Sequence, residues 1–157
     1  MRPHKVTREI NVPAACTQHQ PAGSQSMTIS GECFCGAITY QVTGDLREAR
    51  SCHCSRCRKA FSSQASAYAL VEPDDFSWVT GTDLLTTYIG NSGAGLQFCS
   101  RCGSTLCGIV AGVVHGVALG CVNGDPGVEI AQHIFVGSKA PWEVIPQGVT
   151  AYETAPP

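Results

Sequence analysis

The 157-residue sequence lacks the long apolar runs that membrane-spanning helices require. No stretch approaches the roughly 18 consecutive apolar residues that a helix needs to cross a bilayer. Residues 1–16 contain basic side chains but no apolar segment, so we predict no secretory signal peptide. Strong charge of one sign is also missing, since the formal net charge is −2. Proteins that bind nucleic acid or anionic membranes usually carry a basic excess, so we expect neither as a partner.

Cysteine, in contrast, is present in unusual number. Ten cysteines fit either a secreted disulfide framework or an intracellular metal protein. Most of them lie in C-x-C or C-x-x-C pairs, such as Cys33–Cys35 and Cys99–Cys102. Such close pairs chelate one ion easily and are poor long-range crosslinks. With no signal peptide, this spacing favours reduced thiols, bound zinc and a cytoplasmic location.

The chain divides into two regions of different composition. Residues 1–26 include the polar, small-residue stretch PAACTQHQPAGSQS, which has neither helical nor strand periodicity. We therefore predict a disordered N-terminal extension in which Cys16 and His19 bind no metal. Short β-type runs bounded by Gly, Pro and Asp fill the rest. They predict a single zinc-binding domain over residues 27–157, mainly β, with short antiparallel strands.

Local patterns within this domain predict individual elements. In AITYQV, the apolar residues Ile38, Tyr40 and Val42 alternate with polar ones, so they should share one face of a strand. The only expected helix is a short one over residues 55–61. We expect NGDPG to form a turn between the last two strands. The C-terminal AYETAPP should be a frayed tail.

Two of the cysteine pairs are followed immediately by glycine, in GECFCGA and FCSRCGS. In such a knuckle, glycine lets the backbone turn so that its N–H groups approach the sulfurs. Two knuckles clamped on one ion make a closed four-thiolate site, which is typical of structural zinc. The ligands that we predict for this site are Cys33, Cys35, Cys99 and Cys102.

Three further cysteines, Cys52, Cys54 and Cys57, lie within six residues. Three ligands from one short segment cap only one side of an ion, and zinc with an open fourth position is the arrangement used in catalysis. The alternative is a second closed structural site. The adjacent His53 should point away, because neighbours in an extended segment alternate. The distant candidates for a fourth ligand are Cys107, Cys121, His115 and His133, although both cysteines are more typical of small buried hydrophobic residues.

Three basic residues, Arg56, Arg58 and Lys59, surround this triplet. Zinc with three thiolates carries a net charge of about −1, and a fourth thiolate would make it about −2. The three cations would offset that charge and could bind a carboxylate of the incoming ligand. The alternative is an ordinary solvated face of charged residues.

Four motifs occur in order along the chain: GECFCGAITYQV, CHCSRCRKA, FCSRCGSTL and HIFVGSKAPWEVI. Together they resemble the glutathione-dependent formaldehyde-activating enzyme family, which includes centromere protein V-like proteins, over residues 29–153. The resemblance implies a β-tent fold, a structural zinc on the four knuckle cysteines and a catalytic zinc on Cys52, Cys54 and Cys57. It also implies a carbon–sulfur lyase activity that joins glutathione to formaldehyde as S-hydroxymethylglutathione.

The expected function is therefore a zinc-dependent lyase that binds glutathione or a similar thiol and adds it to formaldehyde or another small aldehyde. Two alternatives are a non-catalytic glutathione carrier and a structural zinc module that recruits a macromolecule. One segment departs from the family, because FSSQAS follows CRKA where many relatives have small or Gly-rich residues. Phe61 is expected to reshape the pocket there, and Trp142 is expected to pack in the core.

Overall fold

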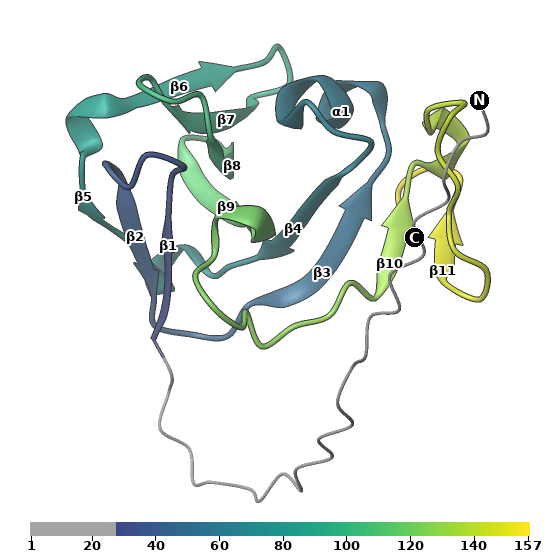
Figure 1. Ribbon diagram of the computed structural model, residues 1–157, viewed down its shortest axis with the longest axis horizontal. Helices are drawn as coiled ribbons and strands as arrows, with labels where there is room; N and C mark the ends of the chain where they lie inside the picture. The colour runs from purple at the N-terminus through teal and green to yellow at the C-terminus, as the bar shows by residue number, and fades with distance from the viewer. Residues whose placement is uncertain (1–27) are drawn as a thin grey trace, which may run out of the picture.

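The computed structural model describes residues 28–157. The predicted N-terminal extension, with Cys16 and His19, lies outside the described residues. The described part forms two sheets and one short α-helix (Figure 1). Within it, no helix has the length and apolarity needed to traverse a bilayer. The predicted mainly β fold of short strands is confirmed.

The smaller sheet contains three antiparallel strands in the order β1 (Ile29–Glu32), β2 (Thr39–Val42) and β5 (Phe76–Thr80). The alternation predicted for AITYQV is confirmed, because Ile38, Tyr40 and Val42 are all fully buried. The Tyr40 ring stacks on Phe76 with a centroid separation of 5.3 Å. Aromatic stacking of this kind adds to the stabilisation from burial.

The larger sheet has eight strands. Their order is β11 (Thr150–Tyr152), β10 (Gln132–Ile134), β3 (Arg47–Cys52), β4 (Ser66–Leu70), β9 (Val113–Ala118), β8 (Thr105–Val110), β7 (Ala94–Cys99) and β6 (Leu85–Ile89). All neighbours are antiparallel except β10, which lies parallel to both β3 and β11. Short 3-10 turns occur at Pro73–Asp75, Thr82–Leu84, Leu119–Cys121 and Val136–Ser138.

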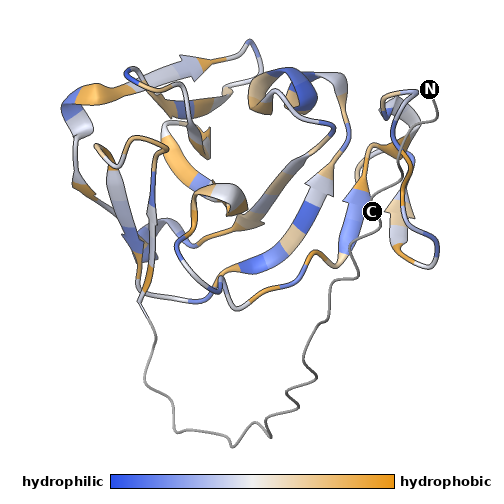
Figure 2. Cartoon of the chain, in the orientation of Figure 1, coloured by the Kyte–Doolittle hydropathy of each residue, from blue (hydrophilic) through white to orange (hydrophobic). Residues whose placement is uncertain are grey.

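The core lies between the two sheets and takes side chains from both. Ile38 and Val42 of the smaller sheet belong to the same buried cluster as Leu106 and Val117 of the larger one. Figure 2 shows hydrophobic residues on β9, which lies in the middle of the molecule. Burying these apolar surfaces is the main source of stability. The core therefore fixes the two sheets relative to each other, and the cysteine pairs project from their ends.

The predicted helix is confirmed, because α1 covers Ser55–Phe61. The NGDPG segment is not a hairpin turn, since β10 pairs with β3 rather than with β9. It forms part of the connection from β9 to β10. Gly124 and Gly127 have positive φ there, and the Asp125 Oδ1 accepts a hydrogen bond from the Gly127 N–H. The prediction of a frayed tail is wrong. Thr150–Tyr152 forms β11, whose backbone groups pair with the edge of β10.

Candidate metal centres

The four knuckle cysteines meet at one end of the two sheets. Cys33 and Cys35 lie between β1 and β2, whereas Cys99 ends β7 and Cys102 lies in the turn before β8. The Sγ atoms of Cys33 and Cys35 are 3.5 Å apart, and those of Cys35 and Cys99 are 3.9 Å apart. All four sulfurs lie within 4.8 Å of one another. With Zn–S bonds of about 2.3 Å, tetrahedral geometry separates neighbouring sulfurs by about 3.8 Å. The four thiols therefore fit one tetrahedral metal ion without rearrangement.

The glycine after each pair has the backbone conformation that the knuckle requires. Gly36 and Gly103 have φ values of 70° and 77°. These values lie in the left-handed region, which residues with a Cβ rarely adopt. The turn brings the Ile38 N–H to within 3.3 Å of the Cys33 Sγ. Backbone donors of this kind stabilise a thiolate, so the knuckle favours the charged form that binds metal.

The second group of thiols lies where β3 passes into α1. Cys52 ends β3, Cys54 is the N-cap of α1, and Cys57 is in its first turn. Their three sulfurs lie within 4.8 Å of one another, and the Cys54 Sγ accepts a hydrogen bond from the Cys57 N–H at 3.3 Å. Clustered thiolates are ligands that zinc prefers. Because N-terminal N–H groups and the helix dipole favour negative charge, this position suits a cluster of thiolates.

The electrostatic surroundings of this group favour a thiolate. Hydrogen bonds with Cys52, which has the largest effect, and with Cys54 and Ser66 together lower the pKa of the Cys57 thiol to about 6, against the effect of burial. The same interaction with Cys57, together with burial, raises the pKa of Cys52 above its usual range. The nearby Arg56 also stabilises the Cys57 thiolate. One negative charge is thus already stabilised in the cluster.

Among the described residues, no fourth His, Cys, Asp or Glu joins this group. The four distant residues considered as a fourth ligand all lie outside this three-cysteine group. Cys107 is buried in the core and donates to the Gln97 side chain, and Cys121 donates to the Thr105 carbonyl. His115 is exposed on β9, and His133 contacts a different histidine. The group can therefore accept a further ligand from outside the chain.

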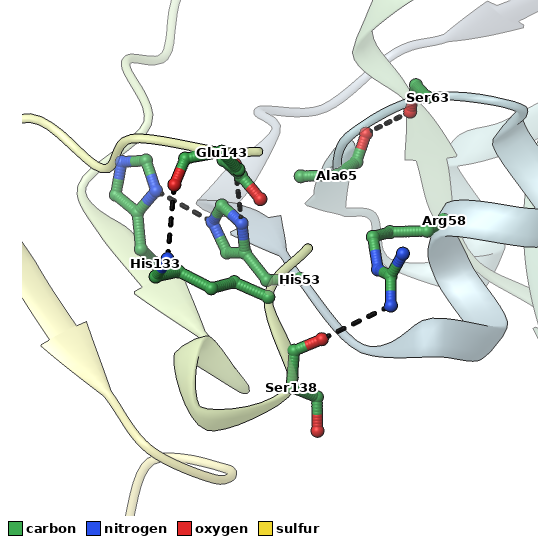
Figure 3. A network of polar contacts seen from close by, with 8 residues as sticks. His53, Arg58, Ser63, Ala65, His133, Ser138 and Glu143 are labelled. Atoms are coloured by element: carbon green, nitrogen blue, oxygen red, sulfur yellow. Dashed lines mark hydrogen bonds and ion pairs between the residues drawn. The ribbon is translucent and has the colours of Figure 1, made fainter. Parts of the chain in front are cut away.

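Behind this cluster lies a buried chain of polar residues that sequence reasoning missed (Figure 3). His53 is not part of the three-thiol group and is only 1% exposed. Its Nε2 lies 2.9 Å from the Nδ1 of His133, and its Nδ1 lies 2.8 Å from the Oε1 of the buried Glu143. The His53 N–H also donates to the Ile134 carbonyl. The C-terminal segment therefore holds the stretch between Cys52 and Cys54 in place, and no local sequence pattern marks Glu143 for this role.

The prediction that Trp142 packs in the core is wrong, because its side chain is 69% exposed. The buried position in this turn is taken by Glu143, which reaches His53, so the neighbouring indole lies outside. The Arg58 guanidinium is 5.8 Å from the centre of the Trp142 ring and donates to the Ser138 carbonyl at 3.3 Å. Arg56 and Lys59 are exposed on α1. Of the three basic residues, Arg58 is thus bound to the C-terminal segment.

A cavity of about 500 Å³ lies between α1, the start of β4 and the second knuckle. Phe61 lines it, and so does Cys102 of the four-cysteine group. The hydroxyl of Thr105 donates to the carbonyl of Ala60 at 3.0 Å and joins the two sides. The complete lining is Phe34, Ala60, Phe61, Ser62, Ser63, Ala65, Ala67, Cys102, Gly103, Ser104, Thr105, Ala118, Gly120 and Cys121.

The model of one protein family, described as glutathione-dependent formaldehyde-activating enzyme, matches residues 28–138. The chain belongs to this family. Membership in the glutathione-dependent formaldehyde-activating enzyme family implies glutathione and formaldehyde as its small-molecule partners. The match includes both cysteine groups and the cavity, and it ends before Trp142 and Glu143.

Among solved structures, a crystal structure of a Rhodobacter sphaeroides protein from a structural genomics programme shares 26% identity with the chain. The alignment covers 78% of this chain and 98% of that one, with a TM-score of 0.49. No curated protein sequence matches the chain.

Proposed function

We propose that this protein is a zinc-dependent carbon–sulfur lyase, which binds glutathione or a similar thiol at Cys52, Cys54 and Cys57 and adds it to a small aldehyde. The observation that carries the proposal is the meeting of three thiols with no fourth ligand from the described chain. Membership in the formaldehyde-activating family supports the same chemistry. A structural role alone would favour a closed set of four ligands.

The donor set fits zinc, because thiolates are soft ligands and their spacing suits a small tetrahedral ion. When bound to three thiolates, zinc would supply one open position and the Lewis acidity that deprotonates an incoming thiol. The chain contributes the charge balance around it. The first turn of α1 donates the Cys57 N–H to the Cys54 Sγ, and Arg56 stabilises negative charge at Cys57.

Thiol activation matters because a free thiol with a pKa near 8.5 is only a few per cent ionised at neutral pH. In the proposed reaction the thiol loses its proton to solvent, and its sulfur forms a bond to the carbonyl carbon. The carbonyl oxygen takes up a proton, so the product is a hydroxymethyl thioether when the aldehyde is formaldehyde. The reverse reaction breaks the same carbon–sulfur bond. Cys52, Cys54 and Cys57 would hold the zinc to which the thiol binds, and the buried His53–Glu143 contact positions the segment that carries them.

For the four knuckle cysteines we propose a closed structural zinc. The support is their spacing, which matches a tetrahedral thiolate site, and their origin in loops of two different sheets. Such a site would crosslink the sheets, since metal-binding free energy becomes folding free energy. It would have no position for a substrate.

The proposed function is tested by the rate at which glutathione and formaldehyde interconvert with their adduct. Exchange NMR with the zinc-loaded chain should show a rate above that of buffer, and Cys57→Ser should return it to the buffer rate. Glutathione binding by calorimetry is measured in parallel. Binding without any acceleration would identify a carrier, and the absence of both would overturn thiol chemistry at this site.

A further inference from the structure

We propose that Tyr68 is a further catalytic residue, whose hydroxyl donates a hydrogen bond to the carbonyl oxygen of the aldehyde while the thiol held at the three-cysteine group adds to the carbonyl carbon. Arg50 and Glu48 are positioning residues that hold the Tyr68 ring in place. This inference rests on the proposed function and names the residue that acts on its second reactant.

Tyr68 lies on the same face of the larger sheet as Cys52. Cys52 of β3 pairs with Ser66 of β4, and two residues along the same two strands Arg50 pairs with Tyr68. Directly paired residues and alternate residues along a strand share one face of a sheet. Alternate residues are about 7 Å apart along the strand. This spacing leaves room for an incoming sulfur and a small carbonyl group between Tyr68 and the three thiols.

The Tyr68 hydroxyl is a hydrogen-bond donor within reach of a ligand. Burial raises the pKa of Tyr68 to about 12, so the phenol is neutral at neutral pH. Negative charge at Cys52 and Cys57 contributes to the same shift, in keeping with a hydroxyl close to both thiols. The polar side chain beside it within residues 28–157 is that of Arg50, which has no acceptor, so the O–H stays free. Tyr68 is half-buried, whereas the Ser66 hydroxyl on the same face is 1% exposed and out of reach of a substrate.

The Tyr68 ring is held from two sides. On one side, the Arg50 guanidinium carbon lies 6.0 Å from the centre of the ring. Arg50 is itself fixed, because it pairs with the Glu48 carboxylate and its Nε donates to the Glu48 carbonyl at 3.1 Å. On the other side, a Cβ at Gly116 of β9 would lie 3.5 Å from the Tyr68 Cδ2. A side chain larger than a methyl group at Gly116 would therefore displace the ring.

The backbone of β3 is irregular at the residue that fixes Arg50. The pairing of β3 with β4 shifts register between Arg47 and Arg50, and Glu48 within this bulge has a φ of 48°. A residue with a Cβ is strained in the left-handed region. Bulges and strained residues are frequent next to active sites, where they redirect a side chain. Here the bulge brings the Glu48 carboxylate to Arg50, which in turn faces Tyr68.

The hydrogen bond from Tyr68 would stabilise the charge that develops on the aldehyde oxygen. An electron pair of the sulfur forms the carbon–sulfur bond, and the π pair of the carbonyl group moves to oxygen, which then takes a proton from water. A donor aimed at this oxygen binds it most strongly when its negative charge is greatest, so the donor lowers the barrier. Tyr68 keeps its own proton throughout.

Tyr68→Phe tests this role, because it removes the hydroxyl and keeps the ring. Exchange NMR of glutathione, formaldehyde and their adduct with the full zinc-loaded chain should show a catalysed rate lower by at least about 10-fold. The glutathione affinity by calorimetry should stay within about twofold, because the hydroxyl contacts the aldehyde and not the thiol. The matched control Tyr40→Phe removes a hydroxyl from β2 in the smaller sheet and should leave both quantities unchanged.

Arg50→Met should slow the exchange by about threefold or more, because the ring loses its fixed position. Arg50→Lys keeps a cation opposite Glu48 and should restore part of the rate. The matched control is Arg47→Met on the same strand, which breaks the exposed ion pair with Glu72 and should leave the rate unchanged.

An unchanged rate in Tyr68→Phe, or a loss of glutathione affinity as large as the loss of rate, would overturn the catalytic role of Tyr68. If the wild type still accelerates the exchange, the proposed function survives that result. A wild type that binds glutathione and does not accelerate the exchange would overturn both.

Discussion

At the scale of single residues, the cysteines of residues 28–157 occupy three environments. Four thiols form a group that fits a tetrahedral ion, three form an incomplete group, and Cys107 and Cys121 lie apart from both groups. Spacing along the sequence marked the two pairs and the triplet, and the glycine after each pair joined Cys33 and Cys35 with the distant Cys99 and Cys102, the same grouping as in the structure. The separation did not require knowledge of the fold.

Substitutions in the two groups should have different effects. Cys102→Ser should lower bound zinc and unfold the chain, whereas Cys57→Ser should remove one zinc per chain and leave the β-sheet circular dichroism intact. Cys107→Ala, which alters an isolated thiol, should keep two zincs. Metal analysis and circular dichroism measure both quantities. Equal structural damage from Cys102→Ser and Cys57→Ser would contradict the division into a closed and an open site.

Glu143 provides a second test at this scale. Its side chain is buried against His53, and Glu143→Ala would leave the His53 Nδ1 without that partner. The expected loss in the free energy of unfolding is about 3 kcal/mol. Denaturant unfolding measures it, with Glu129→Ala on the exposed surface as control. A loss no larger than that of the control would show that the buried contact does not stabilise the C-terminal segment.

At the scale of elements, sequence patterns predicted what local periodicity determines. The alternation of Ile38, Tyr40 and Val42 and the short helix Ser55–Phe61 were correct. The partners of β10 could not be predicted, because a three-residue strand shows no period and its neighbours lie far away in sequence. The prediction that Trp142 is buried failed because it rested on hydrophobicity alone. In the structure the buried residue of this turn is its neighbour Glu143, whose carboxylate contacts His53.

The hairpin between β8 and β9 gives a prediction independent of the site. Its two turn residues, Ala111 and Gly112, both have positive φ, at 50° and 83°. Such a two-residue turn favours Asn–Gly, because alanine in the left-handed region is strained by about 1 kcal/mol. Ala111→Asn should therefore raise the free energy of unfolding by about this amount. A decrease in the denaturant midpoint would contradict this assignment of the turn.

At the scale of the whole molecule, the four-cysteine group connects the two sheets away from their shared core. Cys33 and Cys35 come from the β1–β2 loop, and Cys99 and Cys102 come from the end of β7 and the turn that follows. A metal ion there would restrain both sheets at once. The group and the core would therefore stabilise the same arrangement from different sides.

Removal of metal should accordingly unfold the protein rather than only inactivate it. Binding to structural zinc sites contributes about 10–16 kcal/mol in small zinc-binding peptides, which is as large as the stability of many domains. We expect a chelator to lower the Tm of the wild type by more than about 10 °C, and to lower the Tm of Cys57→Ser, which keeps the four-cysteine site, by a similar amount. Scanning calorimetry with a metal assay measures both. An unchanged Tm after complete zinc removal would contradict a structural role for the metal.

The central claim is that the group formed by Cys52, Cys54 and Cys57 takes its fourth ligand from outside the chain. The most direct measurement is a titration of the cobalt-substituted protein with glutathione, followed by visible absorption. The account predicts a saturable spectral change in the wild type that is absent in Cys57→Ser. A wild-type spectrum that glutathione leaves unchanged would contradict it.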